Sequence, residues 1–142
     1  NGGNASGAAK VTVATNHLGG YQVKMNGEAT GFNGVTNASE KFAPVANNTT
    51  TFPTTGSSVF GYQTTKEGTV TNVTFANENW NGLSDTATLI ATGTKATENA
   101  GDTFTITFRA HASESQAADT YDEVVTITAT TNLSAGEGDG DA

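Results

Sequence analysis

The amino-acid sequence predicts an all-β protein: a β-sandwich, immunoglobulin-like or jelly-roll, of about seven to nine short strands. Its 142 residues include 27 Thr, 17 Gly and 14 Asn but only 4 Leu. Thr favours strands, whereas Gly and Asn favour turns and weaken helices. Apolar residues alternate with Thr in several short segments, and turn-forming residues separate these segments. Such period-two alternation is typical of half-buried strands.

The first strands follow a start made of small residues. Residues 1–8 (NGGNASGA) are predicted to be a flexible lead-in. In residues 10–15 (KVTVAT), Val alternates with Thr and Ala, and in residues 21–27 (YQVKMNG) three apolar side chains share one face. The Gly-containing link between these two strands predicts a hairpin.

Alternation recurs along the rest of the chain. It is clearest in residues 102–110 (DTFTITFRA) and in a last strand that carries Val125 and Ile127. Residues 113–119 predict about one helical turn at a corner. Further strands are predicted at residues 41–45, 58–64, 69–75 and 86–93.

The length is that of one domain. Residues 9–132 are predicted to form a single β-sandwich with a lean core, because Val, Phe, Leu and Ile together number only 24. Residues 133–142 form an acidic, Gly-rich tail with almost nothing to fold around. We expect a contact with a neighbouring subunit to hold this tail, since free chain ends are rarely ordered by themselves.

Composition excludes several classes of function. The absence of Cys excludes a disulfide framework, a thiolate metal site and a cysteine nucleophile. Six scattered basic residues cannot form a phosphate-binding stripe, so we expect no nucleic-acid partner. No apolar run approaches the ~18–20 residues of a membrane span. His17 and His111 are the only imidazoles, and no nucleophile-elbow motif accompanies them, so we expect no enzyme.

Three segments resemble a known group of proteins: residues 10–25 (KVTVATNHLGGYQVKM), residues 60–64 (FGYQT) and residues 101–132 (GDTFTITFRAHASESQAADTYDEVVTITATTN). They are similar to the Thr- and Asn-rich β-sandwich surface proteins of prokaryotes, which include cell-wall proteins and pilin-like filament subunits. The resemblance implies an extracellular, structural role and supplies no catalytic residue. Because the chain begins at Asn1 without an apolar leader, we expect that a leader is removed on export.

We therefore expect a structural subunit of an extracellular filament or pilus, a homopolymer joined head to tail by β-strand complementation. In some of the filament families that the sequence resembles, an end of each subunit completes the sheet of the next. Backbone bonds then give affinity, and alternate side chains set the register. The acceptor groove is predicted beside Val125 and Ile127, and the C-terminal segment is an equal candidate for the strand that crosses. The predicted inter-subunit strand is Lys10, Val11, Thr12, Val13, Ala14 and Thr15.

An alternative from another class is a monomeric cell-surface module for adhesion or carbohydrate binding, with surface glycans as partners. It predicts an exposed aromatic patch drawn from Tyr21, Tyr62, Trp80 and Tyr121. In a structural subunit the same residues would instead be core or corner side chains. Tyr121, just before the last strand, is typical of a corner tyrosine that bonds back to the backbone.

Oxygen-rich segments make calcium a candidate cofactor. Asn77, Asn79 and Asn81 stand at alternate positions before a Gly, which is the spacing of a calcium loop. Asp85 lies four residues further on, whereas Thr88 occupies the place of the usual bidentate Glu. A second candidate group of ligands is Glu137, Asp139 and Asp141 in the tail.

Two covalent modifications are also candidates. Lys10 and Asn132 match the Lys and Asn of Gram-positive pilins that form isopeptide bonds, with Asp122 or Glu123 as the acid. That reaction needs a desolvated pocket in which the Lys loses its proton and the acid keeps one. N-x-S/T sequons predict glycan attachment, although chance matches are frequent in a chain so rich in Asn and Thr. The sequons begin at Asn4, Asn37, Asn47, Asn48, Asn72 and Asn132.

Overall fold

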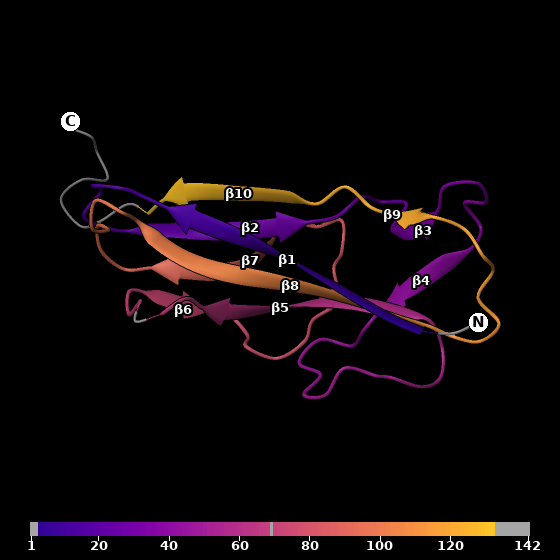
Figure 1. Ribbon diagram of the computed structural model, residues 1–142. Coiled ribbons are helices and arrows are strands. Elements are labelled where there is room, and N and C mark those ends of the chain that lie inside the picture. The colour runs from indigo at the N-terminus through magenta and orange to yellow at the C-terminus, as the bar shows by residue number, and fades with distance from the viewer. Residues whose placement is uncertain (1–2, 69, 133–142) are drawn as a thin grey trace.

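The computed structural model describes residues 3–68 and 70–132, and it confirms the all-β sandwich. Ten strands form two sheets that pack together (Figure 1). Within these residues no helix is long and apolar enough to span a membrane. The strands are β1 (Gly3–Val13), β2 (Tyr21–Asn26), β3 (Phe32–Gly34), β4 (Lys41–Pro44), β5 (Val59–Lys66), β6 (Val73–Phe75), β7 (Thr88–Gly93), β8 (Asp102–Ala112), β9 (Tyr121–Asp122) and β10 (Thr126–Thr131).

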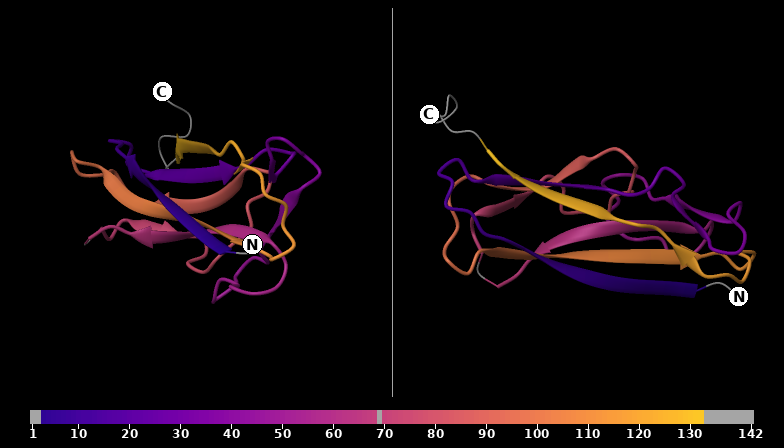
Figure 2. Two further views of the ribbon diagram at one scale, coloured as in Figure 1. Left: turned by 45° about the vertical axis from the view of Figure 1, so that its right-hand side comes forward. Right: turned by 90° about the horizontal axis from the view of Figure 1, so that it is seen from above.

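The larger sheet has six strands in the order β1-β8-β5-β4-β3-β9, and the smaller has four in the order β10-β2-β7-β6. Strand β8 pairs antiparallel with β1 on one side and with β5 on the other. The first and last strands each form an edge, β1 of the larger sheet and β10 of the smaller. Figure 2 shows these two layers from two further directions.

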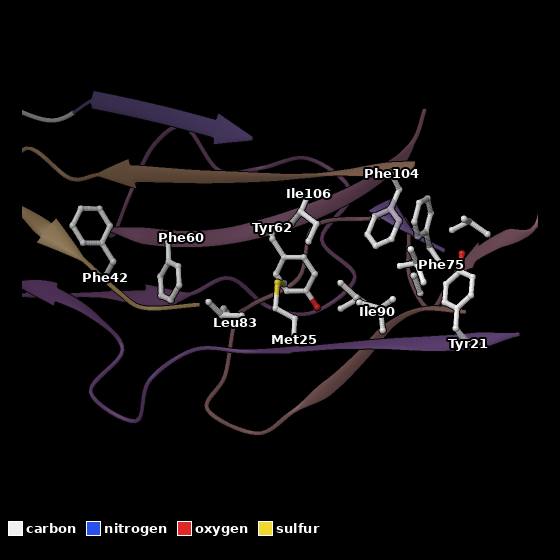
Figure 3. Packing of buried hydrophobic residues seen from close by; sticks show 14 residues of the cluster. Tyr21, Met25, Phe42, Phe60, Tyr62, Phe75, Leu83, Ile90, Phe104 and Ile106 are labelled. Carbon is white, nitrogen blue, oxygen red and sulfur yellow. The ribbon is translucent and has the colours of Figure 1, made fainter. Parts of the chain in front are cut away.

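The core lies between the sheets, where alternate side chains of each strand point inward. On β2, Tyr21 and Met25 are each 1% exposed, and on β8, Phe104 and Ile106 are fully buried. Figure 3 shows side chains from both layers meeting in one continuous cluster. The rings of Phe75 and Phe104 pack edge to face with centroids 5.5 Å apart, a favourable aromatic geometry.

A second, smaller apolar cluster joins Phe52 and Trp80, whose ring centroids are 5.0 Å apart, to Val45. The loop that carries Trp80 reaches strand β5 through paired backbone bonds between Tyr62 and Asn81, each 2.9 Å long. Gly61 permits this approach, because a Cβ there would lie 2.8 Å from the Asn81 carbonyl oxygen. The two loops before β5 and β7 are thus fastened to the larger sheet.

The predicted hairpin between the first two strands is wrong, because β1 and β2 belong to different sheets. Residues 14–20 carry the chain from one layer to the other and end at Gly20, whose φ of 80° favours glycine. Each strand finds its partner far along the chain, β1 at β8 and β2 at β7 and β10. Alternation identifies a strand, but it does not identify the partner.

Several element bounds also differ from the prediction. Residues 3–8, expected to be a flexible lead-in, form the first half of β1, because the open edge of β8 binds their backbone. The very short strands β3 and β9 were not predicted. The helical turn expected at residues 113–119 is not a helix: a bond from the Gln116 N–H to the Ser113 carbonyl, 3.1 Å long, closes a tight turn there.

The described chain starts and finishes at opposite ends of the sandwich (Figures 1 and 2). Gly3 lies opposite Ala112, the last residue of β8. At the other end, Asn132 donates to the Tyr21 carbonyl, and the Tyr21 hydroxyl reaches Asp102, the first residue of β8. A strand rises about 3.3 Å per residue, so the length of β8 separates the two ends by roughly 33 Å.

Candidate functional site

Strand β1 contains most of the predicted inter-subunit segment and lies at an open edge. Within the part of the chain that the structure describes, it bonds along one side only, to β8. Residues 3–8 are exposed, Val11 is half-buried and Val13 is buried. Ala14 and Thr15 lie beyond the strand, in the crossing between the sheets. The first half of β1 is therefore held mainly by backbone bonds rather than by buried side chains.

An apolar groove of about 330 Å³ opens between β1 and the segment that leads into β10. Phe60 and Phe108 of the larger sheet line it, together with Ala5 and Gly7 of β1 and with Val125. Because Ala5 and Gly7 carry almost no side chain, β1 covers little of the apolar surface beside it. The groove thus contacts β1 at residues 5–7, which precede the predicted segment at residues 10–15.

The two predicted acceptor residues have different settings. Val125 is half-buried, packs against the core and lines the groove. Ile127 lies opposite Met25 on β2, and directly opposite residues share one face of a sheet. Met25 is 1% exposed, yet Ile127 is 38% exposed. The larger sheet therefore leaves the inner face of β10 partly uncovered.

Glu123 also lines the groove, and no pattern around it in the sequence indicates its burial. Its Oε2 accepts a 2.9 Å hydrogen bond from the Glu28 N–H, while a Glu28 carboxylate oxygen accepts one from the Val124 N–H. Among the described residues, the buried Oε1 of Glu123 has no hydrogen-bond partner. Burial raises the pKa of Glu123, the bond from the Glu28 N–H lowers it, and the charge of Glu28 raises it.

The four aromatic residues of the binding-module alternative are packed into the protein. Tyr21, Tyr62 and Trp80 are buried, and Tyr121 is half-buried. The Tyr121 hydroxyl donates to the Ala117 carbonyl at 2.6 Å, which confirms the corner tyrosine. These rings pack within the fold and do not form an exposed patch.

The asparagines of the candidate calcium loop hold two loops together. The Asn77 side-chain oxygen accepts a bond from the Asn79 N–H at 2.8 Å, and that of Asn81 accepts one from the Asn48 N–H at 3.0 Å. Asn79 donates from its amide to the side-chain oxygen of Asn48 at 2.6 Å. Two of the three oxygens that would bind calcium are therefore bonded to backbone N–H groups. Asp85 is exposed to solvent.

Residues 3–68 and 70–132 contain no group of three or more His, Cys, Asp or Glu side chains that could hold a metal ion. The second calcium candidate, formed by Glu137, Asp139 and Asp141, lies outside the described residues. The predicted subunit contact of residues 133–142 lies outside them as well.

The structure does not bring the members of the candidate isopeptide site together. Lys10 is paired with Glu67 at the surface, with a nitrogen–oxygen distance of 3.5 Å. The Asn132 amide donates to three backbone carbonyls at 3.1, 3.1 and 3.3 Å. The acids, Asp122 and Glu123, precede β10, whereas Asn132 follows it.

No family model matches the chain, and no match was found among curated proteins or among solved structures. Function is therefore inferred from the residues and geometry of the chain itself. The most distinctive arrangement is the edge strand β1 beside the apolar groove.

Proposed function

We propose that the protein is a structural subunit of an extracellular filament or pilus, a homopolymer joined by β-strand complementation. In this proposal β1 of one copy completes the larger sheet of the next copy. In the same proposal, the protein is related to the Thr- and Asn-rich surface proteins of prokaryotes and is located outside the cell. One observation carries it: among the described residues, β1 is an 11-residue edge strand that bonds only to β8 and borders an apolar groove.

Exchange of β1 between copies preserves its bonds, because the same strand pairs with the same β8 edge in either place. Domain swapping of this kind is a low-cost route to assembly. Residues 14–20, which already cross between the sheets, would serve as the hinge. When each copy receives β1 from one neighbour and passes its own to another, the contact does not close and a fibre forms, whereas reciprocal exchange closes as a dimer.

A T12C/T103C variant tests the exchange. Thr12 and Thr103 lie opposite each other on β1 and β8, with hydroxyl oxygens 2.9 Å apart. Closely opposed side chains of this kind suit a disulfide, and the natural chain has no Cys to compete. Oxidation of the monomer should lock β1 in its own sheet and abolish assembly. Oxidation after assembly should instead link neighbouring copies into a ladder on a non-reducing gel.

A K24C/T128C variant is the matched control. Lys24 and Thr128 are exposed and lie opposite each other on β2 and β10, so their disulfide leaves β1 free. This lock should not affect assembly. If it blocks assembly while the locked T12C/T103C monomer still assembles, the C-terminal strand is the one that crosses. A monomeric binding module would remain a monomer in every redox state.

A further inference from the structure

We propose that Asn37, in the loop between β3 and β4, is the sequon at which the folded protein is glycosylated, and that Asn72 and Asn132 are not modified. The substrate class is a polyprenyl-phosphate-linked sugar, transferred to the side-chain amide nitrogen by an oligosaccharyltransferase. This inference does not depend on strand exchange, because it rests on the side-chain geometry of the sequons.

The Asn37 sequon has its amide oxygen bonded, and its amide nitrogen has no hydrogen-bond partner among residues 3–68 and 70–132. The side-chain oxygen accepts hydrogen bonds from both the Ser39 N–H, at 3.1 Å, and the Ser39 hydroxyl, at 2.7 Å. Two donors on one atom identify that atom as the oxygen, since an amide nitrogen would itself donate. The nitrogen consequently faces away from Ser39, and residues 35–39 are all exposed.

The same bonds favour the chemistry of attachment. An amide nitrogen is a poor nucleophile because its lone pair is delocalised into the carbonyl. A hydroxyl that donates to the carbonyl oxygen makes the amide N–H more acidic, because it stabilises the negative charge that the oxygen gains when that proton leaves. Removal of the proton by a base gives an imidate, whose nitrogen has a lone pair free to react. The nitrogen can then form a bond to C1 of the sugar while the bond from C1 to the lipid phosphate oxygen breaks. The displaced lipid phosphate carries the electron pair away, and the amide proton passes to a base of the transferase.

The loop is fixed in this conformation by neighbouring groups. The Asp119 carboxylate accepts bonds from the Thr36 N–H at 3.2 Å and the Asn37 N–H at 3.0 Å. The Glu40 N–H donates to the Asn37 carbonyl at 3.1 Å and closes the turn. The site is therefore presented as a preformed turn on the surface, and the bound sugar would extend into solvent.

Two other sequons use the amide nitrogen itself to hold the fold. The Asn72 nitrogen donates to the Lys95 carbonyl at 3.1 Å and to the buried Asp102 carboxylate at 2.8 Å. The Asn132 nitrogen donates to three backbone carbonyls. A sugar on either nitrogen would replace one of its two N–H donors, so at least one of these bonds would be lost, and the sugar would have to fit inside the packed end of the sandwich.

The remaining three sequons lack the hydroxyl-to-oxygen bond. The Asn4 oxygen is paired with the buried His111 ring at 2.9 Å. The Asn47 oxygen accepts a bond from the Gly82 N–H, and the Thr49 hydroxyl of that sequon donates instead to the Ala46 carbonyl. The Asn48 oxygen is taken by the amide of Asn79. Among the six sequons, only Asn37 in the described structure combines a free nitrogen with an oxygen bonded to its own sequon hydroxyl.

The test incubates the folded chain with a sequon-reading oligosaccharyltransferase and its lipid-linked oligosaccharide, and then maps glycopeptides by mass spectrometry. Asn37 should have the highest occupancy, and Asn72 and Asn132 should have none. In tryptic peptides of the same chain, which have no fold, Asn72 and Asn132 should become acceptors.

Variants distinguish the contribution of the Ser39 hydroxyl to glycosylation from that of the turn held by Asp119. Ser39→Ala should lose glycan at Asn37, Ser39→Thr should keep it, and Asp119→Asn should lower it by loosening the loop. An unmodified Asn37 in the folded chain would overturn the proposal. Equal occupancy of Asn37 and Asn72 in the folded chain would overturn it too, because the fold would then not select the site.

Discussion

A buried polar cluster fastens the end of the sandwich where β10 finishes. Asp102 is 7% exposed, and its carboxylate accepts hydrogen bonds of 2.8 Å from both the Tyr21 hydroxyl and the Asn72 amide. Burial raises the pKa of Tyr21, and the bond to Asp102 and its charge raise it further, so the hydroxyl keeps its proton. A buried carboxylate with two donors is stable, whereas an unpaired one is not. These residues tie β2, β8 and the turn before β6 into one unit.

Glu123, in contrast to Asp102, has a buried carboxylate oxygen without a hydrogen-bond partner among the described residues. We therefore expect its effect on stability to depend on pH. Burial raises its pKa in the folded protein above the ordinary value of 4.5, so the folded state holds the proton more tightly than the unfolded chain does. Its contribution to stability is therefore full below the unfolded pKa and is lost as the pH rises through the folded pKa. Glu123→Gln should be more stable than the parent at pH 7, and the difference should shrink toward pH 4.

Urea unfolding at a series of pH values measures this difference. Glu98→Gln is the matched control, since Glu98 is exposed and its side chain has no hydrogen bond among the described residues. Its stability difference from the parent, measured at the same pH values, is the baseline for the Glu123 effect. If the Glu123→Gln variant is less stable than the parent at pH 7, then burial of the charged carboxylate does not destabilise the fold.

The loops before β5 and β7 depend on the asparagine contacts between them. Asn81 accepts the Asn48 N–H, and Asn48 has a left-handed backbone with φ of 67°, which few residues other than Gly tolerate well. Asn81→Ala should lower the free energy of unfolding by about 1–3 kcal/mol, because a partly buried donor loses its acceptor. Asn99→Ala, at an exposed position, should change it by less than about 0.5 kcal/mol. Thermal and urea denaturation measure both values, and equal effects of the two substitutions would contradict the role of the Asn81 contact.

Strands with strong alternation were predictable, and strands defined by their neighbours were not. In β8, Phe104 and Ile106 alternate with Thr, and the strand was found within two residues of its end. The first half of β1 consists of Gly, Asn, Ser and Ala, so only the edge of β8 makes it a strand. β3 and β9 have three and two residues, too few for any periodic pattern.

The candidate site was predictable in part. Val125 lines an apolar groove, and its alternation with Thr126 indicates an inward side chain. Its role as an acceptor residue stays a prediction. The burial of Glu123 was not predictable, because it results from Gly27 and Glu28, which are distant in sequence. The asparagines at residues 77–81 have the spacing of a calcium loop, but the Asn77 oxygen accepts from the Asn79 N–H and the Asn81 oxygen accepts from Asn48, in the loop before β5. Residue types fix which bonds are available, and the fold decides which are made.

The molecule as a whole is a sandwich with unequal layers, six strands against four. The inner side of the larger sheet near β1 and the inner face of β10 are therefore covered incompletely. Unpaired sheet edges are templates for pairing with another chain, and natural monomers usually protect them. Here the first and last described strands, β1 and β10, are both edge strands. In a filament, such an edge would pair with a strand of the next copy. Assembly would also stabilise each copy by mass action.

Negative-stain electron microscopy of the native protein, beside light scattering of the purified chain, tests the central claim most directly. The account predicts long, uniform fibres that are built from one polypeptide and grow with protein concentration. A population that remains monomeric at every concentration, or that stops at a closed dimer, would contradict the filament and leave β1 as an ordinary edge strand of its own domain.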